Sequence, residues 1–356
     1  MALSLPPPAL HPRHGIHEPT SHTPARTAGS VRRTATIDML RPEGLDGPLV
    51  LAARGRDAGT DANGGLHVVA EATCRGVVDF VHGRTLTEVA ADPGPTPEGL
   101  LGARVSSGFR GLLDTVDPAM RDERNLLYLL LDDFPVATLV SGHATMAGRD
   151  ISAPPAPSAG RPAFLSDQCS GFITGGTIMT GLSEKGIPPT VTGPVAPPLT
   201  DPRDPDAWHP TDGLPPQGMR RARRIDVRPA HPGAPVTVDA MFRDSYVRPD
   251  GTETVIHEYT LSAELDPDTG VVTACAATPR VLPWVECPVA AASAGRLVGQ
   301  SLDGLRRRVR KEFGGISTCT HLNDMLRALE DVPVLLHLAA DGGRPSPQLS
   351  LKTKEM

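Results

Sequence analysis

Val255-Ile-His-Glu-Tyr-Thr-Leu-Ser-Ala-Glu-Leu265 is the clearest β-strand pattern in the chain, because apolar and polar residues alternate along much of it. The turn sequences Arg248-Pro-Asp-Gly-Thr252 and Asp266-Pro-Asp-Thr-Gly270 flank this strand. Strand patterns also cover residues 236–246 and 271–278. Three strands joined by two short turns predict an antiparallel meander.

Helical patterns follow the meander. Residues 288–313 place Leu297, Val298, Leu302, Leu305 and Val309 on one face, which predicts a helix packed against the sheet. A second helix is predicted at 323–329.

The first half of the chain has the same order of strands before helices. Strand patterns cover residues 34–39, 49–53, 67–72 and 76–81. A helical pattern follows at 100–113, and an apolar run covers 126–140.

Parts of the two halves also resemble each other in sequence. Residues 32–39, which include Arg32, Arg33 and Asp38, resemble 223–227, and residues 86–93 resemble 272–279. These similarities favour an internal duplication, although chance similarity in a biased composition is the alternative. We therefore predict an α+β fold with two related halves, each an antiparallel β-sheet covered by helices, joined by a long Pro-rich connector.

The predicted boundaries follow the composition along the chain. Residues 1–30 are rich in Pro and His and predict a disordered tail. The N-terminal α+β half, a degenerate repeat, covers 31–150, and the Pro/Gly-rich connector covers 151–219. The C-terminal α+β domain covers 220–338, and a second disordered tail covers 339–356.

The overall composition excludes several classes of protein. The chain has 356 residues, with 38 Pro and 36 Gly, and a net charge of −6, which argues against general binding of nucleic acids. No apolar run is long enough to span a membrane. The five cysteines are widely spaced and odd in number. We therefore expect a cytoplasmic protein without a disulfide framework; the pattern leaves its oligomeric state open.

The segment Ser317-Thr-Cys-Thr-His-Leu322 carries the strongest chemical signal. It places the thiol of Cys319 and the imidazole of His321 at a predicted helix start, where the helix dipole lowers the pKa of a thiol. His257 and Cys287 lie upstream, where a strand or a loop is expected to end. All four are metal-ligand types that suit tetrahedral zinc or iron. Four protein ligands would make a structural site, and three would leave a catalytic position open.

These residues resemble a bacterial family of unknown function. The similarity covers about residues 220–335 and rests on a strand His, His257, a Pro-x-x-x-Cys segment ending at Cys287, and Cys319-Thr-His-Leu322. Small members of the family carry a terminal Gly-Cys-Thr-His-Leu signature; here Ser317-Thr318 replaces the glycine. The layout is also similar to the scaffold fold of iron–sulfur assembly proteins. That likeness implies ligand roles for His257, Cys287 and Cys319, with a His in place of the scaffold's first cysteine.

Two further segments are candidate site elements. Asp167 and Cys169 lie in an unusual Gly-rich stretch of the connector and could form a second-site loop, although an ordinary loop is the simpler interpretation. The basic run 219–224 could bind a phosphate or a coenzyme A tail. A solvated linker, with its arginines paired to acidic residues, is the alternative.

The sequence predicts an uncharacterised cytoplasmic, metal- or thiol-dependent enzyme that acts on a small organic substrate, such as an acyl or coenzyme A-linked one. Cys287, Cys319 and His321 would be catalytic, and His257, Cys287, Cys319 and His321 would hold Zn or Fe. A non-enzymatic metal-binding or scaffold protein is the alternative from another class. A third interpretation places a buried His and small apolar cysteines in the core.

Overall fold

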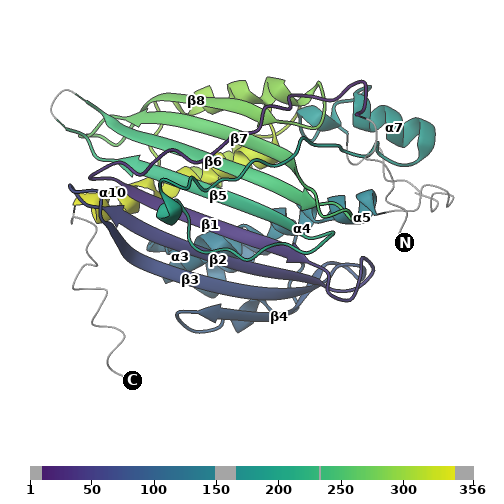
Figure 1. Cartoon of the computed structure of the whole chain (residues 1–356), viewed down its shortest axis with the longest axis horizontal. Helices are drawn as coiled ribbons and strands as arrows, with labels where there is room; N and C mark the ends of the chain where they lie inside the picture. The colour runs from purple at the N-terminus through teal and green to yellow at the C-terminus, as the bar shows by residue number, and fades with distance from the viewer. Residues whose placement is uncertain (1–9, 149–165, 232–233, 341–356) are drawn as a thin grey trace.

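A computed structural model of the chain describes residues 10–148, 166–231 and 234–340. Its centre is one eight-stranded antiparallel sheet with the order β4-β3-β2-β1-β5-β6-β7-β8 (Figure 1). The strands are β1 (Val31–Leu40), β2 (Leu49–Thr60), β3 (Leu66–Asp79), β4 (Thr85–Asp92), β5 (Met219–Arg228), β6 (Val236–Val247), β7 (Glu253–Leu265) and β8 (Val272–Val281). The prediction of antiparallel sheet with helices is confirmed.

The prediction of a separate sheet in each half is wrong. Strands β1 and β5 pair along their whole length, from Val31 opposite Val227 to Met39 opposite Met219, and so join two four-stranded meanders. Each meander would otherwise expose an unpaired row of backbone N–H and C=O groups at that edge. Pairing β1 with β5 satisfies both rows and leaves β4 and β8 as the outer strands of the sheet.

Helices cover one face of the sheet (Figure 1). Helix α3 packs on β2 and β3, α10 on β1 and β5, α9 on β6, and the 3-10 segment η4 on β8. Their bounds, with those of the remaining helices, are η1 (Glu98–Leu100), α1 (Phe109–Val116), α2 (Pro118–Asp122), α3 (Leu126–Asp132), α4 (Phe134–Val140), α5 (Gly142–Ala147), η2 (Ser170–Phe172), α7 (Thr177–Lys185), η3 (Pro205–Ala207), η4 (Cys287–Leu297), α8 (Leu305–Glu312), α9 (Thr320–Ala328), η5 (Leu329–Asp331) and α10 (Val332–Ala340).

The opposite face of the sheet is crossed by irregular chain, part of it from the predicted connector (Figure 1). Trp208 packs with Ala222 of β5 and Met241 of β6. The ring nitrogens of His209 lie 2.8 and 2.9 Å from the hydroxyls of Thr34 and Thr36. Strand β1 is therefore buried on both faces, and its residues are not split into a buried and an exposed set.

Residues 10–30 lie along the folded body, although the sequence predicts a disordered tail for 1–30. His14 and His17 form β-bridges with Trp284 and Val281, and the indole Nε1 of Trp208 donates to Thr23 Oγ1. Residues 166–218 of the predicted connector include η2, α7 and η3. Residues 1–9, 151–165 and 341–356 of the predicted tails and connector lie outside the described residues.

A layer of buried ion pairs lies between the sheet and its helices, and we call it the Arg–Asp layer. Arg33 of β1 binds Asp57 of β2 through two 2.7 Å hydrogen bonds, and both side chains are at most 3% exposed. The layer comprises Arg33, Arg110, Arg221, Arg223, Arg306 and Arg327 together with Asp57, Asp132, Asp133, Asp244, Asp324 and Asp331.

This layer corrects the interpretation of the basic run 219–224. The run is strand β5, and Arg221 and Arg223 point into the layer, where Asp244 and Asp133 bind them. Arg220 and Arg224 pair with aspartates on the opposite face. Because each guanidinium already has a carboxylate partner, the run offers no free cationic surface for a phosphate or a coenzyme A tail.

Candidate functional site

Two neighbouring strands and one helix bring three ligand-type side chains together. Asp244 of β6 and His257 of β7 are cross-strand partners, and His321 lies in the first turn of α9, which packs on β6. One ligand atom from each residue lies within 4.8 Å of the others. We call Asp244, His257 and His321 the Asp–His–His group, and it is a residue group that could hold a metal ion.

The two imidazole rings of this group stack. Their centroids are 3.9 Å apart, and the ring planes differ by 21°. His257 Nδ1 lies 3.4 Å from Asp244 Oδ2, and the His257 side chain is 15% exposed. A carboxylate beside one ring nitrogen is the usual device that orients a histidine, so that its other nitrogen faces a metal or a proton.

Asp244 is held as an anion by the Arg–Asp layer. Arg221 donates to both carboxylate oxygens, through Nε at 2.7 Å and Nη2 at 2.8 Å. Burial pushes the pKa of Asp244 up, but Arg221 and His257 outweigh it and hold that pKa well below its ordinary value. Asp244 therefore carries its negative charge at neutral pH.

Two nearby histidines, His321 and His143, are held neutral. Burial, reinforced by His257, keeps the pKa of His321 well below its ordinary value, although Asp244 opposes the shift. Burial and His257 also lower the pKa of His143, on α5, to about 4; its ring meets that of Tyr246 edge to face at 4.9 Å. A neutral imidazole binds a metal without first losing a proton.

A thiol adjoins the Asp–His–His group. Cys319 is the N-cap of α9, and its Sγ lies 3.7 Å from Nδ1 of His321. The backbone N–H groups of His321 and Leu322 and the nearby Tyr259 favour the thiolate of Cys319 and so lower its pKa. Burial nevertheless raises the pKa of Cys319 to about 12, so the thiol keeps its proton at neutral pH.

The structure brings together only part of the predicted ligand set. His257 and His321 belong to the Asp–His–His group, and Cys319 touches its edge. Among the described residues, Cys287 and Cys319 are not members of that group; Asp244 takes the third place. Cys287 begins η4, and Cys169, one of the two candidates in the connector, precedes η2 and is buried.

Asp167, the other connector candidate, is engaged within its own loop. Its carboxylate accepts from Thr174 N at 2.8 Å and from Thr174 Oγ1 at 2.9 Å. These bonds close the turn that precedes α7, and they account for this carboxylate without a ligand.

Sequence reasoning missed Asp244, Arg221, His143 and Tyr259. A carboxylate in a strand next to an arginine looks solvent-exposed in sequence. The available signal was the Arg-Asp doublet, which occurs at Arg56-Asp57 in β2 and again at Arg243-Asp244 in β6. For His143, on a short helix far from the other residues in sequence, we see no signal.

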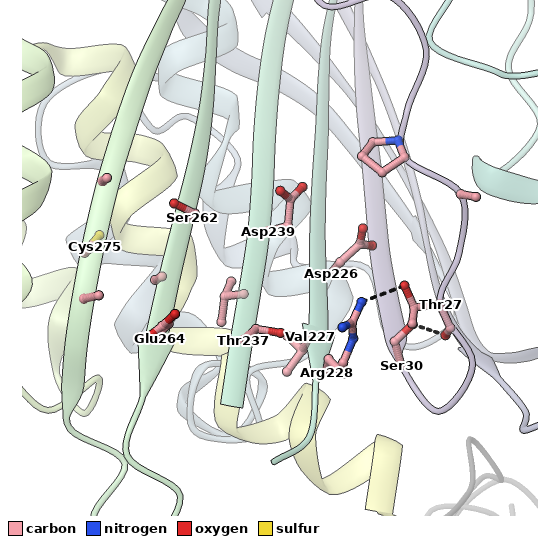
Figure 2. A pocket seen from close by; sticks show the side chains of 16 residues that line it. Thr27, Ser30, Asp226, Val227, Arg228, Thr237, Asp239, Ser262, Glu264 and Cys275 are labelled. Carbon is pink, nitrogen blue, oxygen red and sulfur yellow. Dashed lines mark hydrogen bonds between the residues drawn. The ribbon is translucent and has the colours of Figure 1, made fainter. Parts of the chain in front are cut away.

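Two cavities lie away from these residues. A groove of about 500 Å³ runs over the opposite face of the sheet, between the N-terminal segment near Thr27 and strands β5 to β8; Asp226, Asp239, Glu264 and Cys275 line it (Figure 2). A second cavity, of about 370 Å³, lies between α7 and the N-terminal segment at His11 and Arg13. Neither cavity is lined by Asp244, His257 or His321.

Residues 219–335 match a family described as protein of unknown function (DUF2889). The matched segment runs from β5 into α10 and contains the Asp–His–His group, Cys287 and Cys319; His143 and Cys169 lie outside it. No curated protein and no solved structure matches the chain. Within the part of the chain that the structure describes, no helix is long and apolar enough to cross a membrane.

Proposed function

We propose that the protein is a metal-dependent enzyme that acts on a small organic substrate, with its metal at the Asp–His–His group. The convergence of Asp244, His257 and His321 within 4.8 Å is the observation that supports this proposal. Two imidazoles and a carboxylate suit Zn²⁺ or Fe²⁺ and leave coordination positions open for a substrate or water.

The chemistry of the donors fits a cation. His321 is neutral and Asp244 is anionic, so neither of these two ligands has to lose a proton first, and Asp244 brings a negative charge. Arg221 donates one hydrogen bond to each oxygen of Asp244 and fixes this carboxylate beside His257, and each oxygen keeps a second lone pair for a metal. Cys319 would then be the additional ligand or the reacting thiol, because its sulfur adjoins His321.

A bound metal would supply a Lewis acid that polarises an oxygen of the substrate. The chain's own groups would position that substrate and move protons. Tyr259 lies near the Cys319 thiol, and the side chains of His257 and His321 are partly exposed, so these groups can contact a bound substrate. All five cysteines are free thiols, which agrees with the cytoplasmic location that we include in the proposal.

A non-enzymatic metal-binding or scaffold protein is the second candidate. One observation favours it, because neither of the two cavities is lined by the Asp–His–His group. Enzymes usually enclose a small substrate in a concave pocket. The likeness to the iron–sulfur scaffold layout belongs to this candidate.

Metal analysis tests the proposal. The full chain, purified without chelators, is expected to contain about one zinc or iron ion per molecule, measured by inductively coupled plasma mass spectrometry. The double variant His257→Ala/His321→Ala should lose it. His67→Ala is the matched control, because His67 pairs with Asp61 on the exposed side of β3, 48% exposed. Absence of metal from the wild type would contradict the proposal.

A second measurement separates the enzyme from the binding protein. Cobalt substituted into the site reports its coordination through its visible spectrum. An enzyme is expected to bind an added anion, such as azide, at an open position and to change that spectrum. A spectrum that azide leaves unchanged would favour four protein ligands and the non-enzymatic candidate.

We also propose that the two halves arose by duplication. Reciprocal ion pairs support this idea: Arg32 binds Asp226 through Nε and Nη2, and Arg220 binds Asp38 through the same atoms. A further repeated pair is Arg33–Asp57 and Arg221–Asp244, whose aspartates lie across from Ala70 and His257. The first half therefore has an alanine where the second has the site histidine.

A further inference from the structure

Helix α8 carries a concentration of positive charge on the side that faces solvent. Its basic side chains there are exposed or half-buried, and one exposed arginine of η4 joins them. We call these residues the α8 basic surface: Arg296, Arg307, Arg308, Arg310 and Lys311. Arg296 belongs to the surface because its Nη2 donates to the carbonyl oxygen of Glu312 at 2.9 Å. The surface is positive although the whole chain has a net charge of −6.

The chain provides few negative charges to balance this surface. Within the described residues, the surface makes one ion pair, between Arg310 and Asp114, and it is long at 3.9 Å. An exposed arginine on another surface shows the contrast, because Arg203 binds Asp201 at 2.6 Å. The guanidinium and ammonium groups of the α8 basic surface therefore remain open to an anion from outside the chain.

These charges do not stabilise their own helix. Arg307 and Lys311 are four residues apart and Arg308 and Lys311 are three apart, so like charges are neighbours on the helix surface. Arg307 also lies in the first turn of α8, which contains no acidic residue, and the helix dipole disfavours a positive charge there. Buried Leu305 and Val309 hold the helix on the protein instead. Recognition of a partner explains this concentration of charge better than helix formation does.

Exposed apolar side chains accompany the basic ones. The guanidinium carbon of Arg296 lies 4.2 Å from the centre of the Phe313 ring, so the ends of η4 and α8 are in contact. Val298 follows closely after Arg296 and Ile316 closely after Phe313, and their side chains are 47% and 46% exposed. A partner at this surface would therefore meet apolar groups beside the positive charge.

We propose that the α8 basic surface binds an acidic segment of a partner protein, with apolar residues beside its Asp and Glu side chains. Guanidinium groups bind carboxylates through paired, charge-assisted hydrogen bonds. Helix α8 has eight residues. It is thus about 12 Å long, and an extended segment of about four residues would span it. The proposal is separate from the proposed metal chemistry, because none of these residues belongs to the Asp–His–His group.

A short acidic segment suits this surface better than a nucleic acid or an anionic membrane. Those two partners are extended, and they would also face acidic neighbours of the surface such as Asp303, which is 80% exposed, and Glu312. The net charge of −6 opposes their approach. Salt limits attraction between exposed charges to about 8 Å under physiological conditions, so the surface gains little from distant phosphates.

Binding of a labelled peptide tests the proposal. The probe is a fluorescein-labelled oligoglutamate peptide with a leucine at each end, and binding to the full chain is measured by fluorescence anisotropy. The double variant Arg307→Glu/Lys311→Glu is expected to weaken binding by about tenfold or more, because it reverses two exposed charges. Arg203→Glu is the matched control, since it reverses an exposed charge away from α8 and should leave binding at the wild-type level.

The wild-type chain gives a second test that no folding defect can obscure. A DNA oligonucleotide and vesicles that contain phosphatidylserine replace the peptide, and both are expected to bind more weakly than the peptide does. Thermal unfolding of the double variant at the wild-type temperature would show that its fold is intact. Tighter binding of wild type to the oligonucleotide or the vesicles would overturn the proposal, as would equal binding of the peptide by wild type and the double variant.

Discussion

His209 shows how a single residue can make the stability of this fold depend on pH. Burial, with Arg56, Arg54 and Arg220, lowers its pKa to about 3. A histidine in the unfolded chain has a pKa near 6.5. Between pH 6.5 and 3, residue 209 therefore binds a proton in the unfolded chain but not in the folded chain. The stability that His209 contributes is thus complete above pH 6.5 and is lost as the pH falls.

Replacing His209 should therefore reduce the loss of unfolding free energy that occurs as the pH falls below 6.5. Wild-type protein is expected to lose up to about 1.4 kcal/mol of unfolding free energy per pH unit through this residue below pH 6.5. His209→Gln should lose correspondingly less between pH 7 and 4.5, measured by urea unfolding. His231→Gln, at an exposed position, is the control. Equal slopes for His209→Gln and wild type would refute this account.

At the level of residues, local sequence predicts position better than function. The Cys319-Thr-His321 segment is predicted at a helix start, and the structure has it at the N-cap and first turn of α9. His257 and His321 belong to one predicted site; their rings stack, and their role stays a prediction. Asp244 was missed, because only the cross-strand register, opposite His257, brings it into the group.

At the level of elements, the strands were predicted well where turns mark their ends. The predicted strands 236–246 and 255–265 correspond to β6 (Val236–Val247) and β7 (Glu253–Leu265). The predicted helix 288–313 is instead the 3-10 segment η4 followed by α8, with a break at Gly299 and Gly304, both of positive φ. Left-handed backbone at these glycines ends one segment and starts the next.

Two Gly→Ala changes should have opposite effects in different elements. At Gly76 in β3 a Cβ would stand 2.6 Å from Phe134 Cε2, so Gly76→Ala should cost about 1–3 kcal/mol of unfolding free energy through overpacking. At Gly111 in α1 a Cβ meets nothing within 4 Å, and Gly111→Ala should gain about 0.5–1 kcal/mol from helix propensity. Denaturant unfolding measures both, and effects of the same sign would contradict the packing account.

The whole molecule was the least predictable scale. The α+β class and the antiparallel meanders follow from local alternation and turns. The joining of β1 to β5 does not, because it pairs residues 180 to 196 positions apart, from Met39–Met219 to Val31–Val227, and depends on an edge that no local pattern reveals. The Arg–Asp layer is hidden for a similar reason, since arginines such as Arg33 and Arg223 read as surface residues until their partners are placed.

The symmetry of the β1–β5 seam predicts how the C-terminal half behaves alone. A fragment of residues 219–340 would expose the β5 edge, and its own Arg220 and Asp226 could replace the pairs that these residues form with Asp38 and Arg32. We expect the fragment to form a dimer through antiparallel β5–β5 pairing, measured by light scattering after size-exclusion chromatography. Asp226→Arg should weaken this dimer, because it places a second positive charge opposite Arg220 of the other copy. A stable monomeric fragment would count against the idea.

The central position of β1 has a consequence for synthesis on the ribosome. Strand β1 ends at Leu40, and its second partner β5 ends at Arg228. At about 5–20 residues per second, the nascent chain waits roughly 10–40 s with one side of β1 unpaired. During that time the unpaired backbone N–H and C=O groups of β1 can pair with the same strand of another nascent chain on the polysome. The yield of folded protein should therefore depend on the speed of translation and on chaperones that bind nascent chains. The finished sheet, in which β1 is paired on both sides, does not reveal this dependence.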